Sequence, residues 1–146
     1  MVNAALLDVN VLIALLWPAH ESHARAQRWF TQNAQQGWAT CALTQLGFVR
    51  VTSNPGFSGR AVSPRDALEV LRGTMSHPGH RFWTEDLGVT EALPQFGRRL
   101  MGHQQITDAY LVALAIHKKG RLVTFDTSIG SLLQDSATAK AHLVLL

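Results

Sequence analysis

The sequence contains a single cysteine, Cys41, so no disulfide can form within the chain and no metal site can be built from several thiolates. Long apolar runs are also missing. The stretch Val9–Trp17 is too short to cross a bilayer, and no cluster of basic residues precedes it. We therefore expect neither a signal peptide nor a membrane span, and the lone thiol between apolar neighbours favours a core position in a reducing, cytoplasmic setting.

Blocks of like charge, low-complexity tracts and internal repeats are absent from the 146 residues as well. This length, with 47% apolar residues, predicts one domain over residues 1–146 that can bury a substantial core. The formal net charge of +3 permits a polyanionic partner but does not require one. Most of the basic residues are arginine, which suits bidentate phosphate contacts and serves equally well on a solvated surface.

Short apolar runs alternate along the chain with segments of helical spacing. Strands are expected at Ala4–Asp8, Trp38–Cys41, Arg81–Trp83, Leu122–Phe125 and His142–Leu146. Helices are expected at Val9–Leu16, His20–Gln35, Leu43–Thr52, Pro64–Met75 with Ser63 as its cap, Thr90–Phe96, Gln104–Gly120 and Ile129–Leu133. Turn-rich loops are expected at Phe57–Val62 and Gly97–His103. The alternation predicts an α/β fold, a sandwich of helices around a mainly parallel sheet.

The segment Gln104–Gly120 is the strongest helical pattern in the chain. Thr107 is expected to cap its first turn, and Asp108 in that turn faces the positive end of the helix macrodipole. Gly120, after two lysines, is expected to end it. Asp108 is therefore predicted to lie at the start of a central helix.

Two further acids end predicted strands, Asp8 after the first and Asp126 after the fourth. Because the carboxyl ends of parallel strands meet at one edge of a sheet, these side chains and Asp108 can converge there. Clustered carboxylates repel one another unless a cation lies among them, and hard oxygen ligands suit Mg²⁺ or Mn²⁺. The alternative is that Asp8 and Asp108 only cap helices and that Asp126 begins a turn.

Four blocks of the sequence together resemble a known family. They are LLDVNVLIALL at residues 6–16, T-x-L-G-F-V-R at 44–50, ITDAYLVALA at 106–115 and LVTFD at 122–126. In this order they resemble PIN-domain proteins, and more narrowly the VapC-type ribonuclease toxins of toxin–antitoxin pairs. The resemblance implies a compact α/β/α sandwich, an acidic pocket for Mg²⁺ or Mn²⁺, endonucleolytic cleavage of RNA, a small VapB-like antitoxin that blocks the pocket, and a homodimer.

Carried over to this sequence, the resemblance implies that Asp8, Asp108 and Asp126 bind the metal. It implies that Asn10, Thr107 and Thr124 are supporting polar residues. The family pattern has one more acid, a glutamate on the helix after the second strand, and Gln45 stands at that place.

Glutamine has nearly the shape of glutamate but brings no charge, so the metal would be held less strongly and one proton acceptor would be lost. Three interpretations follow. Gln45 acts as a neutral partner of three catalytic aspartates, or the chain is weakly active or catalytically silent, or Gln45 points to solvent and the true counterpart lies a turn away.

Arg98, Arg99 and His103 precede the central helix, and we expect them to contact the RNA backbone at the rim of the acidic pocket. A solvated basic loop is the alternative. A phosphotransferase of the haloacid-dehalogenase type would need a second acid where Asn10 stands, and a receiver domain would need an acidic pair ahead of its central aspartate. A binding module without catalysis is the other class, and if it has no metal pocket it would show no specific response to Mn²⁺.

Overall fold

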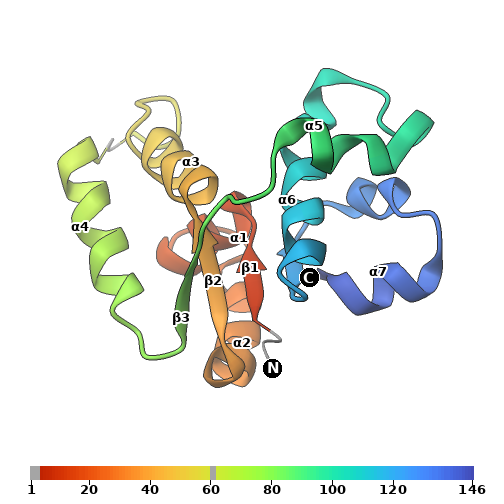
Figure 1. Cartoon of the computed structure of the whole chain (residues 1–146). Helices are drawn as coiled ribbons and strands as arrows, with labels where there is room; N and C mark the ends of the chain where they lie inside the picture. The colour runs from red at the N-terminus through yellow and green to blue at the C-terminus, as the bar shows by residue number, and fades with distance from the viewer. Residues whose placement is uncertain (1–3, 60–61) are drawn as a thin grey trace.

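The computed structural model describes residues 4–59 and 62–146 (Figure 1). Its centre is a five-stranded sheet in the order β3-β2-β1-β4-β5, and all four strand pairs are parallel. The expected α/β sandwich is confirmed. Part of the predicted loop Phe57–Val62, residues 60 and 61, lies outside the described residues.

The strands are short and separated by helical segments. They are β1 (Ala5–Leu7), β2 (Trp38–Cys41), β3 (His80–Trp83), β4 (Arg121–Thr124) and β5 (Leu143–Leu145). The α-helices are α1 (Val9–Leu16), α2 (His23–Asn33), α3 (Ala42–Thr52), α4 (Pro64–Met75), α5 (Val89–Ala92), α6 (Ile106–His117) and α7 (Ser136–His142). Short 3₁₀ segments are η1 (Ala34–Gln36), η2 (Leu93–Arg99), η3 (His103–Gln105) and η4 (Thr127–Leu132).

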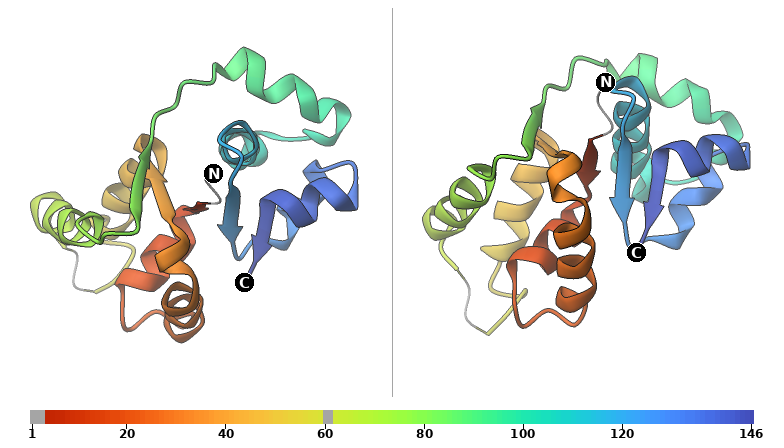
Figure 2. Two further views of the ribbon diagram at one scale, coloured as in Figure 1. Left: turned by 60° about the horizontal axis from the view of Figure 1, so that its bottom comes forward. Right: turned by 90° about the horizontal axis from the view of Figure 1, so that it is seen from below.

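Helices cover both faces of the sheet, because alternate strand residues point to opposite sides. Leu6 and Leu122 pack with α5 and α6 in one core, whereas Leu7 and Val123 pack with α1 to α4 in the other. Figure 2 shows these two helical layers on either side of the strands. The strands are therefore apolar on both faces, as expected of a buried parallel sheet.

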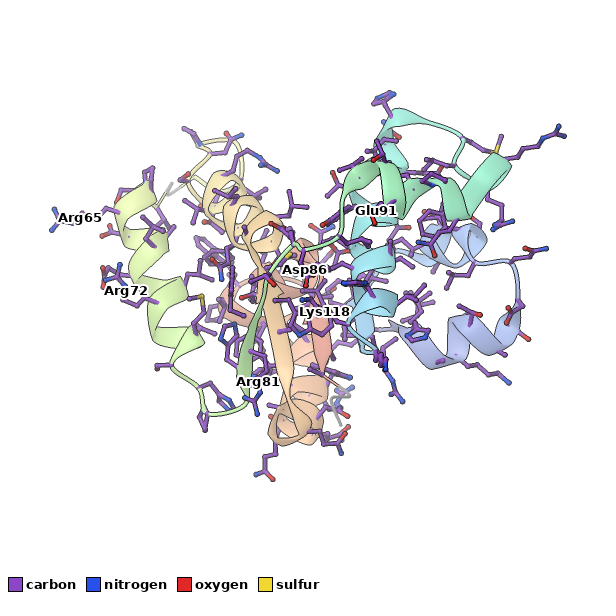
Figure 3. The ribbon with its side chains drawn as sticks, viewed as in Figure 1. Arg65, Arg72, Arg81, Asp86, Glu91 and Lys118 are labelled. Atoms are coloured by element: carbon purple, nitrogen blue, oxygen red, sulfur yellow. The ribbon has the colours of Figure 1, made fainter. Side chains whose placement is uncertain are left out.

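The order of connections reverses between β1 and β4. The chain builds outward from β1 through β2 to β3, then crosses to the other side of β1 to form β4 and β5. The crossing segment is tied to the end of α6, where Lys118 Nζ lies 3.0 Å from Asp86 Oδ1 (Figure 3). In open α/β sheets, ligands bind outside the carboxyl ends of the strands at such a reversal, here the ends of β1 and β4.

Helix α6 begins and ends differently from the prediction. Its cap position is Gln105, and Thr107 is an exposed second residue that makes no capping hydrogen bond, so the expected cap was wrong. Asp108 lies in the first turn, as expected. At the other end Lys119 takes the left-handed conformation (φ 57°), and the Gly120 amide donates to Ala115 O over 2.8 Å, a Schellman closure.

Most predicted elements are confirmed, with two corrections near the C-terminus. Helix α7 was not predicted, and His142 is its last residue rather than the first of a strand. Asp135 caps this helix by accepting from the Thr138 amide over 2.7 Å. The predicted loop Gly97–His103 begins within η2, where Gly97 has a positive φ of 53°.

Gly120 provides a test of packing at the opposite, amino edge of the sheet. A Cβ atom there would collide with the Ala4 carbonyl and lie 2.6 Å from the ring of Trp83. We expect Gly120→Ala to lower the free energy of unfolding by about 1–3 kcal/mol, measured by urea denaturation. The control is Gly73→Ala in α4, whose Cβ would meet nothing within 4 Å and should be neutral or stabilising. Equal effects of the two substitutions would contradict the packing argument.

Candidate functional site

Asp8 ends β1 and occupies the cap position of α1. Its side chain is buried, with 7% of the residue exposed. One carboxylate oxygen accepts from the Val9 amide and the other accepts from the Thr124 hydroxyl, each over 2.8 Å. These two bonds hold the carboxylate at the carboxyl edge of the sheet, where β1 and β4 lie side by side.

Thr124 connects the two strand ends. Its fully buried hydroxyl donates to Asp8 and accepts from the backbone amide of Asp126 over 3.0 Å. The Asp126 carboxylate in turn accepts from the amide and the hydroxyl of Ser128, at 2.9 and 2.7 Å. Asp126 therefore begins a turn, which was the alternative to a metal-binding role. Its backbone is at the same time linked to Asp8 through the Thr124 hydroxyl.

Asp108 approaches from the first turn of α6. It is half-buried, and none of the described residues donates a hydrogen bond to its carboxylate. Burial, followed by the negative charges of Asp8 and then Asp126, raises the pKa of Asp108 to about 6. Burial also raises the pKa of Asp8, against the lowering effect of its two hydrogen bonds, and the charge of Asp126 adds to the rise.

The three aspartates are therefore electrostatically coupled although they come from residues far apart in the chain. As the side chains stand, no group of three His, Cys, Asp or Glu residues within the described ranges converges closely enough to ligate one ion. The donor set nevertheless fits a divalent cation: the oxygens are hard ligands, and the excess negative charge that raises the pKa of Asp108 is what a cation relieves. To bind one ion together, the three carboxylates would have to turn toward a common point.

The Gln45 side chain of α3 is held by contacts with β2 and α4 rather than by the aspartates. Its amide nitrogen donates to the Thr40 hydroxyl over 2.9 Å and lies 3.2 Å from the sulfur of Met75 in α4. Thr40 is also hydrogen-bonded to His80 in β3. On α3 it is Gly47 that faces α1: a Cβ there would lie 2.6 Å from Val9, the residue after Asp8. At this close approach to the neighbour of Asp8, α3 therefore presents a glycine.

The other predicted residues lie at the periphery. Asn10 is exposed on the first turn of α1, and Arg98 and His103 are exposed before α6. Arg99 is tethered, since its guanidinium donates to Leu132 O over 2.9 Å and to Gln95 O over 3.2 Å. No described contact joins these rim residues to the aspartates.

One residue close to the site, Arg25, was not predicted from the sequence. The guanidinium carbon of Arg25, in α2, lies 4.8 Å above the ring centroid of Phe125, the neighbour of Asp126. One hundred residues separate the two in the sequence, and only Phe125 lies within one of the four quoted blocks, LVTFD. Periodicity therefore contains no signal that could have paired them.

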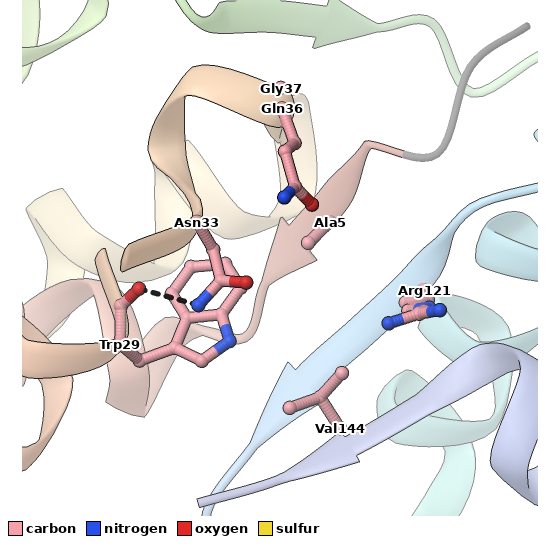
Figure 4. A pocket seen from close by; sticks show the side chains of 7 residues that line it. All are labelled: Ala5, Trp29, Asn33, Gln36, Gly37, Arg121 and Val144. Atoms are coloured by element: carbon pink, nitrogen blue, oxygen red, sulfur yellow. Dashed lines mark hydrogen bonds between the residues drawn. The ribbon is translucent and has the colours of Figure 1, made fainter. Parts of the chain in front are cut away.

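Elsewhere the structure offers less chemistry. Figure 4 shows a small pocket between α2 and the amino ends of the strands, where the Asn33 amide donates to Trp29 O over 2.8 Å. It is lined by Ala5, Trp29, Asn33, Gln36, Gly37, Arg121 and Val144, with no acidic residue among them. Cys41 is a buried free thiol, as expected, and Trp38 and Trp83 are core residues. In the part of the chain that is described, no helix has the length and apolarity needed to span a bilayer.

Comparison with known proteins identifies the family. The PIN domain family profile matches residues 5–132. The chain belongs to the PIN domain family. This confirms the family predicted from the four sequence blocks, and the VapC-type resemblance within it is confirmed by the relatives below.

Three Mycobacterium tuberculosis proteins illustrate the similarity. The protein named ribonuclease VapC38 is 43% identical over 97% of this chain and 99% of its own. Ribonuclease VapC39 is 45% identical over 92% and 94%, and ribonuclease VapC44 is 44% identical over 97% and 99%.

Solved structures agree on the fold. PAE2754 from Pyrobaculum aerophilum superposes with a TM-score of 0.61 at 20% identity, covering 97% of this chain and 83% of its own. FitAcB from Neisseria gonorrhoeae gives a TM-score of 0.57 at 22% identity, covering 95% of each chain.

The raised pKa of Asp108 has a measurable consequence. Because the folded-state pKa, about 6, exceeds the ordinary value of 3.8, the ionised carboxylate costs stability above pH 6, and this cost disappears as the pH falls toward 3.8. In metal-free protein, Asp108→Asn should therefore raise Tm over the wild type most at pH 7.5 and progressively less below pH 6. Thermal melts from pH 7.5 to 5 measure the difference. Asp66→Asn, at an exposed position in α4, is the control, and a difference for Asp108→Asn that does not change with pH would contradict the coupling.

Gln45 provides a second test. Family resemblance predicts that Gln45→Glu strengthens metal binding, whereas the observed bonds to Thr40 and Met75 direct the side chain toward α4. From these bonds we expect unchanged Mn²⁺ affinity, and a small loss in Tm because the glutamate cannot donate to Thr40. Titration of Mn²⁺ followed by tryptophan fluorescence decides between them. A clear gain in affinity would mean that the side chain reaches the aspartates.

Proposed function

We propose that this protein is a metal-dependent endoribonuclease of the VapC type, the toxin of a toxin–antitoxin pair. The observation that carries the proposal is the Thr124 hydroxyl, which bonds both the Asp8 carboxylate and the Asp126 amide at the edge where β1 and β4 end, with Asp108 half-buried in the first turn of α6. RNA as the substrate is inferred from the names of the relatives, which are called ribonucleases and match over nearly their whole length.

The three aspartates would hold Mg²⁺ or Mn²⁺. Bound there, such an ion supplies the positive charge that activates a water and stabilises a phosphodiester under attack. The protein's own part is to keep the carboxylates in place. Thr124 orients Asp8 and fixes the strand end that carries Asp126, while the first turn of α6 presents Asp108 without a competing hydrogen bond.

Substrate and partners follow from the same proposal. Arg98, Arg99 and His103 are proposed to contact the RNA backbone, with Arg98 and His103 the freer of the three, because Arg99 is bound to two backbone carbonyls. We call the carboxyl ends of β1 and β4, with Asp8, Asp108 and Asp126, the acidic edge. A VapB-like antitoxin is proposed to block this edge, and a homodimer acting in the cytoplasm is the expected form. Asn10 and Thr107 are proposed to support the site from its margin, whereas Gln45, bonded to Thr40 and Met75, is not expected to contact the metal.

The second candidate function is a catalytically silent PIN-fold module that binds RNA or protein. One observation favours it. Helix α3 contains no acidic residue, and Gln45 is engaged with Thr40 and Met75, so α3 adds no negative charge to the site. Three carboxylates hold a divalent ion less strongly than four.

One experiment separates the two candidates. Purified protein is incubated with total RNA in Mn²⁺, in Mg²⁺ and in EDTA, and Mn²⁺ binding is followed in parallel by tryptophan fluorescence. Cleavage that requires the metal supports the nuclease. Metal binding without cleavage supports the silent module. If the protein shows neither metal binding nor cleavage, the proposed metal site has no support.

Substitution of the aspartates tests the assignment of residues. We expect Asp8→Asn or Asp108→Asn to abolish Mn²⁺ binding and to reduce RNA cleavage by at least about a hundredfold, because each removes a charged ligand. Circular dichroism should show an unchanged fold. Asp135→Asn serves as the control, since this carboxylate caps α7 and has no described contact with the three aspartates. Full metal-dependent cleavage by either site variant would refute the assignment.

A further inference from the structure

Arg25 is a cation held in place near the acidic edge without an acidic partner. Within the described ranges it forms no ion pair with a carboxylate. Its guanidinium lies over the Phe125 ring at 4.8 Å, and its Nη2 donates to the Ser22 hydroxyl over 3.2 Å. The Nε and Nη1 donors have no protein partner among the described contacts. The side chain is exposed, so these donors face solvent.

The position of α2 explains why this cation lies at the edge. The C-terminal half of the helix, at Trp29 and Asn33, borders the amino ends of the strands (Figure 4). Its first turns therefore extend toward the carboxyl ends, where Arg25 meets Phe125. Phe125 lies between Thr124, which donates to Asp8, and Asp126. The guanidinium is thus anchored to a residue flanked on both sides by members of the candidate site.

The contact with Phe125 prepares the guanidinium for a second ligand. A cation over an aromatic ring is restrained without being neutralised, so its charge and its planar fork of donors stay available. Phosphate oxygens match such a fork bidentately. An RNA strand that approaches three carboxylates is repelled by their charge. A cation at the same end of the sheet, anchored to Phe125 and without a described carboxylate partner, offsets part of that repulsion.

We propose that Arg25, held by Phe125 and Ser22, is a positioning residue that binds a backbone phosphate of the RNA strand next to the three aspartates. The inference rests on the proposed ribonuclease function and adds to it a substrate contact on α2, across the β1–β4 edge from Arg98 and His103. The RNA strand would then pass over the carboxyl ends of β1 and β4. The aspartates would lie between Arg25 on one side and Arg98 and His103 on the other.

The test compares Arg25→Gln with Arg28→Gln. Arg28 lies one turn along α2, is exposed, and has no contact with Phe125 among the described residues, so it is the matched control for charge and helix. Binding of a single-stranded RNA oligonucleotide of mixed sequence is measured in EDTA, where metal-dependent cleavage is blocked, from 50 to 200 mM salt. We expect Arg25→Gln to weaken binding about tenfold at low salt and to reduce the salt slope by about 0.7, the value for one phosphate contact on a single strand.

Two further variants distinguish positioning from charge alone. Arg25→Lys keeps the charge but not the fork, and Phe125→Leu keeps an apolar side chain but removes the ring; both should weaken RNA binding by less than Arg25→Gln. In cleavage assays Arg25→Gln should raise KM more than it lowers kcat, and Mn²⁺ affinity should stay at the wild-type value.

The outcomes separate this inference from the function on which it rests. If wild type binds and cleaves RNA and Arg25→Gln binds it as tightly as wild type does, with the same salt slope, the inference is wrong and the nuclease assignment stands. If wild type binds Mn²⁺ but no RNA, both fail. Equal losses from Arg25→Gln and Arg28→Gln would show diffuse electrostatic attraction and would also overturn the positioning role.

Discussion

The hydroxyl group of Thr124 is the interaction on which the candidate site depends. It is buried at the end of β4, donates to the Asp8 carboxylate and accepts from the Asp126 amide. Because the hydroxyl uses its proton on one strand end and a lone pair on the other, both acids are fixed by a single group. The reversal of strand order between β1 and β4 is what makes these two ends neighbours.

The core around this bond keeps the acids in an environment where their charges interact strongly. Apolar residues on both faces of β1 and β4 exclude water from beneath the site, and α6 brings Asp108 down against it. The same burial that stabilises the fold therefore raises the pKa of Asp108. The clustered carboxylates lower the stability of the metal-free fold and favour binding of a cation. Such an opposition is common at sites where like charges are placed together to bind a ligand.

The sequence predicted the parts of the molecule whose signals are local. Strand ends at Asp8 and Asp126 and the first turn at Asp108 were read correctly because apolar runs and helical spacing mark them. Helix α7 was missed because its seven residues carry little apolar periodicity. The environment of Gln45 and the meeting of Arg25 with Phe125 depend on how α3 and α2 pack, which spacing within one element does not contain.

The absent side chain at Gly47 sets how closely two helices approach. With only hydrogen on its Cα, α3 comes so near α1 that Val9 occupies the space of a Cβ. A carboxylate could enter the acidic edge from this point only if the helices moved apart, and that movement would shift Val9 and the backbone amide that steadies Asp8. The close crossing of α1 and α3 at Gly47 therefore helps to fix the position of the Val9 amide, and with it the carboxylate of Asp8.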